Sequence, residues 1–174
     1  AHGAWSLLEA ARRQRMPLSE SNYVALFAAL CAPSRPPLDK IRSLLKQFER
    51  EPVPLSPLLA PALIKAARLT GRLPDAQRWF DAARKAGVAS VDAHTAMLSA
   101  CANFGAVDLA RTLYRDASAM LSQSQQQTGG NANANANANA NASAQRALDR
   151  TYLRFLLLNG LADEAQPLFE RLVK

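Results

Sequence analysis

Apolar residues recur along this chain at spacings of three and four, which is the period of a helix with one buried face. The clearest stripe comprises Leu59, Ala62, Leu63, Ala66 and Ala67. Gly71 follows this stripe and favours a left-handed helix end, while Pro74 and Asp75 favour the first turn of a new helix. The segment between Pro57 and Ser90 therefore predicts two helices joined by a short turn.

A related pattern follows three glycines. After Gly71, Gly105 and Gly160 there is an acid three or four residues on, an alanine at the fifth position and an aromatic residue at the ninth. Gly105 lies 34 residues after Gly71, and Gly160 lies 55 residues after Gly105, which is 21 more than one period. Because a single hairpin cannot bury its own apolar face, this period predicts hairpins that stack on one another.

We expect an all-α fold, namely an α-solenoid of stacked helix-turn-helix hairpins with about four repeats and a leading half-repeat. The expected segments are 1–19 as the second helix of a partial repeat, 20–56 as a degenerate repeat, 57–90 and 91–121 as repeats, 122–145 as a disordered insertion and 146–174 as the final repeat. The insertion is rich in serine, glutamine and alternating Asn-Ala, with no hydrophobic face. Pro167 predicts a bend in the last helix.

Charge adds a partner class to this picture. Lysine and arginine outnumber acids 21 to 14, for a net charge of +7, which favours a polyanionic partner and RNA first.

Cys31 and Cys101 lie in alanine-rich helical stretches, so we expect buried thiols and a reducing compartment. There is no apolar run of about 18 residues, so we expect no membrane span. The opening at Ala1 is expected of a processed protein or of a segment of a longer one.

The pattern offers no catalytic constellation. The two histidines, His2 and His94, have no cysteine or carboxylate cluster at metal-ligand spacing. The glycines are already explained as helix ends, and none forms a phosphate-binding loop. We expect a protein that is not an enzyme, with no catalytic residue, no metal site and no cofactor.

The period, the glycine-acid-alanine-aromatic pattern and a second glycine at Gly87 resemble the pentatricopeptide repeat (PPR) family, most closely within Val91 to Met120. The tetratricopeptide repeat is the main alternative, but its usual Trp, Leu-Gly and Tyr positions are absent from the first helices. The PPR resemblance implies a concave surface, lined by the first helix of each hairpin, that binds single-stranded RNA at one base per repeat.

In that family, specificity rests on the fifth and the last residue of each repeat. The residues here are Val24, Pro61, Thr95 and Arg150 at the fifth position and Ser56 and Ser90 at the last. Only Thr95 matches the residue types that the family uses. Valine and proline side chains cannot hydrogen-bond a base edge, so the resemblance implies contact with the RNA backbone or with protein more than base reading.

The candidate RNA-binding residues are Lys65, Arg68, Arg72, Thr95, Arg150 and Arg154. The basic ones fall at or near the first-helix side, where phosphate contact would be independent of sequence and sensitive to salt. Ordinary solvated surface charge is the alternative interpretation of these cations.

We expect a structural or assembly component of an organellar ribosome or related ribonucleoprotein. The resemblance favours the mitochondrion, with the plastid as the alternative, and partners that are RNA, first rRNA, and other ribonucleoprotein subunits. Two alternatives stay open, namely a sequence-specific organellar RNA-processing, stability or editing factor and a tetratricopeptide-like scaffold that binds proteins without RNA.

Overall fold

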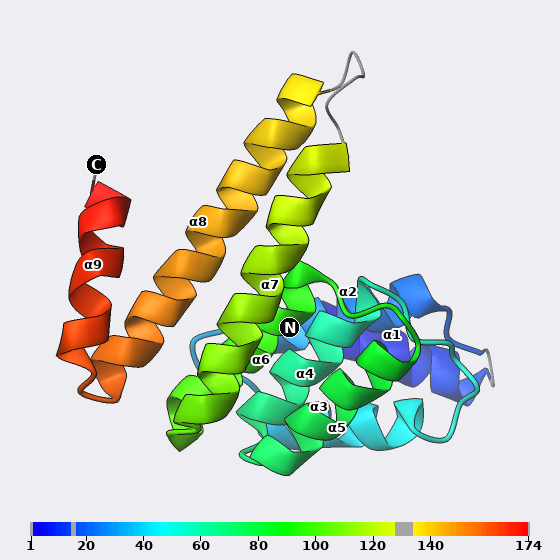
Figure 1. Cartoon of the computed structure of the whole chain (residues 1–174). Coiled ribbons are helices and arrows are strands. Elements are labelled where there is room, and N and C mark those ends of the chain that lie inside the picture. The colour runs from blue at the N-terminus through cyan, green and yellow to red at the C-terminus, as the bar shows by residue number, and fades with distance from the viewer. Residues whose placement is uncertain (1, 15–16, 128–133, 174) are drawn as a thin grey trace. The chain divides into compact units, whose positions relative to one another are not determined.

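The computed structural model describes residues 2–14, 17–127 and 134–173. Within this part the chain forms nine helices and no strand, which confirms the all-α prediction (Figure 1). The chain divides into two compact units, Ala1–Ala89 and Ser90–Lys174, called here the N-terminal unit and the C-terminal unit.

The N-terminal unit contains a leading helix and two hairpins. Its helices are α1 (His2–Arg13), α2 (Glu20–Cys31), α3 (Leu38–Phe48), α4 (Leu59–Leu69) and α5 (Leu73–Lys85). The core is drawn from the first four helices, with Leu8, Tyr23, Phe27, Ile41 and Leu63 at most 1% exposed. Residues 20–90 therefore form two helical hairpins whose large apolar side chains are mostly buried.

The first helices of the two hairpins, α2 and α4, pack against each other. At their starting ends, the Ser56 hydroxyl, just before α4, donates a hydrogen bond to Glu20 in α2. At their far ends, the positive charges of Lys65 and Arg68 in α4 act on the Cys31 thiol in α2. Contacts at both ends place α2 and α4 side by side in a parallel orientation.

A serine precedes the first helix of three hairpins and accepts a hydrogen bond from its first turn; Ser19 and Ser90 are the N-caps of α2 and α6. The hydroxyls of Ser19, Ser56 and Ser90 accept hydrogen bonds from the backbone N–H groups three residues further on, at 3.3, 3.1 and 3.3 Å respectively. Such a bond satisfies one of the free donors at a helix start and contributes about 1 kcal/mol. These serines therefore lie at the start of three of the hairpins, a signal that the sequence interpretation missed.

The C-terminal unit contains α6 (Val91–Phe104), α7 (Val107–Gln127), α8 (Ala134–Leu158) and α9 (Ala162–Val173). Helix α6 packs against α7 and α8, and α9 packs against α8; Figure 1 shows the long α7 and α8 running beside each other. Gly105, which ends α6 at a left-handed φ of 67°, lies next to Asn159, which follows α8. The first helices α6 and α8 therefore also end together and run parallel.

The predicted disordered insertion over 122–145 differs from the structure. Helix α7 extends through Ser122 to Gln127, and α8 begins within the Asn-Ala tract at Ala134. The part of the insertion at 128–133 lies outside the described residues. The described parts of this segment are helical because extending an existing helix avoids the cost of nucleation and because alanine has the highest helix propensity of all residues. A hydrophobic face is not needed for such an extension.

The final helix α9 continues through Pro167, where a bend was predicted. Proline there removes the hydrogen bond to the carbonyl of Asp163. Pro167 itself is exposed, whereas Ala165 and Leu168 on either side of it are buried. The buried residues hold α9 against the unit, so packing offsets the lost hydrogen bond.

Candidate nucleic-acid interface

Lys65 and Arg68 lie together on the solvent side of α4. Lys65 is exposed and makes no ion pair within the described part of the chain, and Arg68 is half-buried. Burial raises the pKa of the Cys31 thiol, and the positive charges of Lys65 and Arg68 oppose that rise. The pair therefore lies close to the C-terminal end of α2, where positive charge also complements the helix dipole.

The structure separates Arg72 from this pair. Helix α4 ends at Leu69, and the chain then turns at Gly71, whose φ is 91°. Because the helical spacing no longer applies beyond that turn, Arg72 does not continue the row of Lys65 and Arg68. It lines a hollow formed by α3, the end of α4 and the start of α5 instead.

Three arginines form a row on α8, where sequence analysis had identified two. Arg146, Arg150 and Arg154 follow one another at steps of four residues, and all three are exposed. None of them makes an ion pair with another described residue; the Nε of Arg146 donates to the Ala142 carbonyl at 3.4 Å. Residues four apart share one side of a helix, so the row presents three positive charges to solvent over about 12 Å. Arg146 was missed because it adjoins the segment predicted to be disordered.

The candidate base-reading positions are largely engaged in local structure. Thr95, on α6, is half-buried, and its hydroxyl donates to the Val91 carbonyl at 2.9 Å. Ser56 and Ser90 accept hydrogen bonds from the first turns of helices, as described above. A hydroxyl that already holds a backbone group has less capacity left for a base edge.

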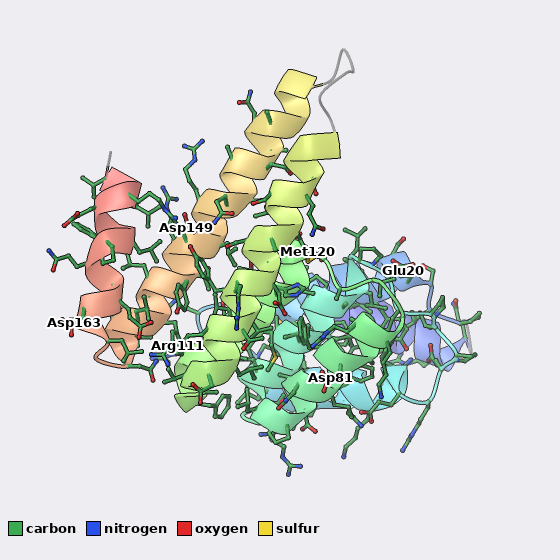
Figure 2. The ribbon with its side chains drawn as sticks, viewed as in Figure 1. Glu20, Asp81, Arg111, Met120, Asp149 and Asp163 are labelled. Atoms are coloured by element: carbon green, nitrogen blue, oxygen red, sulfur yellow. The ribbon has the colours of Figure 1, made fainter. Side chains whose placement is uncertain are left out.

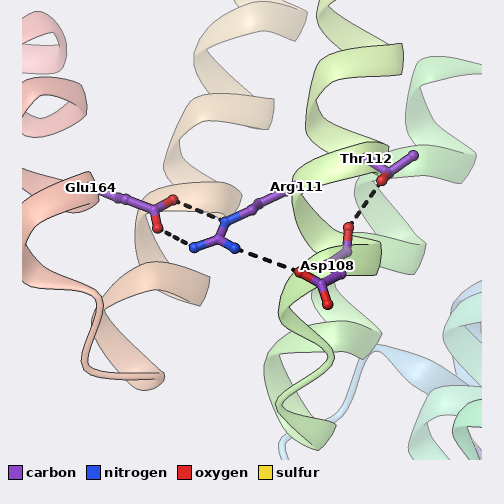
Figure 3. Close-up of polar contacts among 4 residues, drawn as sticks. All are labelled: Asp108, Arg111, Thr112 and Glu164. Carbon is purple, nitrogen blue, oxygen red and sulfur yellow. Dashed lines mark hydrogen bonds and ion pairs between the residues drawn. The ribbon is translucent and has the colours of Figure 1, made fainter.

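Several other cations are committed to ion pairs between helices. Figure 3 shows Arg111 of α7 between Asp108, at 3.6 Å, and Glu164 of α9, with which it makes a two-point contact. The hydrogen bond to Glu164 raises the pKa of Arg111 and lowers that of the Glu164 carboxyl. Arg78 of α5 pairs in a similar way with Glu49, which follows α3. These arginines join structural elements, in contrast to the free row on α8.

Asp149 is the centre of a polar network in the C-terminal unit. It lies on α8, labelled in Figure 2, and is only 3% exposed. Its carboxylate accepts hydrogen bonds from the Tyr114 hydroxyl and from Gln145, each at 2.8 Å, and pairs with Arg171 at 2.8 Å. Burial, and next the hydrogen bond to Asp149, raise the pKa of Tyr114. The network links α7, α8 and α9.

The described residues contain no cluster of three or more His, Cys, Asp or Glu side chains at metal-binding distance. His94 is buried, and its Nδ1 lies 2.9 Å from the Ser90 carbonyl, so it packs within the C-terminal unit. Cys31 and Cys101 are free and buried, as expected. None of the helices in the described ranges has the length and apolarity that a membrane crossing requires.

Comparison with known proteins adds no family or relative. No family model matches the chain, and no curated protein matches it. Functional inference therefore depends on the residues and on the contacts described above.

Proposed function

We propose that this chain is a non-catalytic PPR-type α-solenoid that holds RNA through its phosphate backbone. It acts as a structural or assembly component of an organellar ribonucleoprotein, and the mitochondrial ribosome is the first candidate particle. Its partners are rRNA and neighbouring protein subunits. The observation that carries this proposal is the row of exposed arginines at 146, 150 and 154 on α8, which make no ion pair with any residue that the structure describes.

The packing within each unit supports a repeat architecture of this kind. In the N-terminal unit the first helices α2 and α4 are neighbours, and in the C-terminal unit α6 and α8 are neighbours. Both pairs run parallel, which is the arrangement that successive hairpins of a solenoid adopt. Continuation of the same stacking from one unit to the next is part of the proposal.

The location of the basic residues on the first helices supports RNA contact through phosphates. Lys65 and Arg68 lie on α4 and the arginine row lies on α8, and both are first helices. Structural cations such as Arg111 and Arg78 have carboxylate partners, whereas the α8 row has none among the described residues. Unpaired arginines in a row are suited to successive phosphates along a strand.

The state of the fifth and last positions favours backbone contact over base reading. The hydroxyls of Thr95, Ser56 and Ser90 form hydrogen bonds with backbone groups of helices. The side chains of Val24 and Pro61 have no polar group that could bond a base. Contact of this kind fixes the position of an RNA but carries little sequence information. That property suits a component of an assembled particle, and the PPR resemblance supports an organelle, the mitochondrion or alternatively the plastid.

Crosslinking in cells, followed by sequencing of the attached RNA, tests the proposal directly. Predominant recovery of rRNA is the expected result. Recovery of one mRNA or guide-type RNA would favour a sequence-specific processing factor instead. Absence of RNA would favour a tetratricopeptide-like scaffold for proteins.

A binding experiment in vitro tests the arginine row itself. The triple variant Arg146→Gln, Arg150→Gln and Arg154→Gln should bind single-stranded RNA more weakly and lower the slope of log K against log salt by about 2. The matched control carries Arg50→Gln, Arg84→Gln and Arg115→Gln, which removes the same charge from other exposed positions. Equal slopes for the two triple variants would contradict phosphate contact by the α8 row.

A further inference from the structure

A hollow of about 540 Å³ lies in the N-terminal unit. It is bordered by α3, by the end of α4 and by the start of α5. Four basic side chains line it, namely Arg42, Lys46, Arg72 and Arg78, together with the acids Glu49 and Asp75. Its volume lies within the range of about 300–1,000 Å³ that is usual for small-ligand sites.

Two of the four cations are free to meet a ligand. Lys46 and Arg72 are exposed and make no ion pair within the described residues. Arg42 pairs only with the fully exposed Asp39, at 3.3 Å, and a surface pair of this kind is weak. The hollow therefore presents positive charge from α3 on one side and from the turn before α5 on the other, which suits a phosphate.

An aromatic side chain forms part of the wall. Trp79 is half-buried, and the edge of its ring system packs against Phe48, with ring centroids 5.5 Å apart. The Arg78 guanidinium carbon lies 5.0 Å from the centre of the Trp79 ring, and Glu49 pairs with the same guanidinium. Arg78 thus lies between a carboxylate and an indole, and a guanidinium beside an aromatic ring offers flat surfaces of the type on which bases stack.

The two acids make a bare phosphate a poor match, since each would repel it. Carboxylates do accept hydrogen bonds from ribose hydroxyls and from exocyclic amino groups of bases. A ligand with an anionic group, a flat ring and hydroxyl or amino donors therefore fits this lining better than an anion alone.

We propose that the hollow binds one nucleotide of single-stranded RNA, with its phosphate between Lys46 and Arg72 and its base against the Arg78–Trp79 pair. The inference rests on the proposed RNA-binding function and deepens it, because it adds a contact by residues of the second helices α3 and α5. It also assigns Arg72 to this site and not to the row of Lys65 and Arg68.

Tryptophan fluorescence provides the test, since Trp5 and Trp79 are the only tryptophans in the sequence. In a full-length Trp5→Phe background, an oligouridine of about eight nucleotides should quench Trp79 emission in a saturable manner. Uridine monophosphate, titrated separately, distinguishes a free nucleotide from an RNA strand. Inorganic polyphosphate tests for a charge effect without bases.

The double variant Lys46→Gln and Arg72→Gln should weaken oligouridine binding by at least about tenfold, as expected for the loss of two phosphate contacts. The control variant Arg50→Gln and Arg84→Gln, with the same charge change outside the hollow, should retain binding within about twofold. Circular dichroism of both variants checks that their helix content is unchanged.

Three outcomes would overturn the inference. The first is that neither oligouridine nor uridine monophosphate quenches Trp79 emission. The others are an equal loss of oligouridine affinity in the two double variants and quenching by polyphosphate as strong as that by oligouridine. If the hollow variant binds normally while the triple variant of the α8 row does not, the inference fails and the proposed function stands. If the unsubstituted chain binds no RNA at all, the proposed function fails as well.

Discussion

Replacing Asp149 by alanine should destabilise the C-terminal unit strongly. The carboxylate is 3% exposed, and it holds Tyr114 of α7, Gln145 of its own helix and Arg171 of α9 at 2.8 Å each. Tyr114 also accepts a hydrogen bond from Arg171 at 2.8 Å, so the three groups form a closed triangle. Alanine removes the one anion that all the donors share.

The expected cost is about 2–4 kcal/mol in the free energy of unfolding. A hydrogen bond to a charged group contributes about 1.5–3 kcal/mol, but the sum of three such bonds overestimates the effect. The Arg171 side chain is 58% exposed, so water takes over much of its interaction. Tyr114 keeps its contact with Arg171. Asp149→Asn should cost less, about 1–2 kcal/mol, because one oxygen remains as an acceptor.

Hydrogen exchange followed by mass spectrometry measures this effect on α7, α8 and α9 separately. A loss of 2–4 kcal/mol corresponds to exchange that is about 30- to 700-fold faster in the amides that report opening of the unit. Glu170→Ala is the control, because it removes an exposed acid next to Arg171 on α9. Exchange rates that match between Asp149→Ala and the control would refute a stabilising role for the network.

Three further predictions concern single positions in the C-terminal unit. Gly105→Ala should lower the free energy of unfolding, measured by urea titration, by about 1–2 kcal/mol. The reason is that φ at Gly105 is 67° and an added Cβ would lie 3.4 Å from Asn159 Oδ1. An equal loss of stability in Gly105→Asn would contradict the argument. Burial raises the pKa of the Cys101 thiol to about 11. A disulfide reagent at pH 8 should therefore modify Cys101 only after the chain unfolds. Rapid labelling of Cys101 in the folded chain would disprove this expectation. The raised pKa of Tyr114 favours its neutral form in the folded state, so its contribution is complete below the unfolded pKa of about 10 and is lost as pH rises through the folded value. Tyr114→Phe should therefore be about 1 kcal/mol less stable than the parent at pH 8 but closer to it at pH 11, and a constant difference would count against the linkage.

Local signals in the sequence were sufficient for the helices and their turns. The three-and-four spacing of apolar residues, the glycines at 71, 105 and 160 and the Pro-Asp helix start at 74 and 75 act within one or two helical turns. Helices α4 and α5 lie on either side of Gly71, as these signals indicated. The signals failed for the Asn-Ala tract, because a helix extended from a folded neighbour needs no apolar face.

The candidate site was predicted only in part. Lys65 and Arg68 share one helix, and Arg150 and Arg154 share another, as spacing indicated. Arg72 follows the turn at Gly71 and lines the hollow, and Arg146 was not predicted because it adjoins the segment expected to be disordered. The hollow was not predicted, since its lining comes from three segments of the chain.

The sequence by itself determined the helical class, the period of the hairpins and the excess of positive charge. These features depend on composition and on residues that are close in sequence, so they do not require tertiary contacts. Only the tertiary structure decided which arginines form ion pairs with carboxylates. Arg111, Arg171 and Arg78 meet their carboxylates across helix packing, at sequence separations of 53, 22 and 29 residues, while the α8 row meets none among the described residues. Whether a cation holds the fold together or stays free for a polyanion therefore depends on which helices pack against each other.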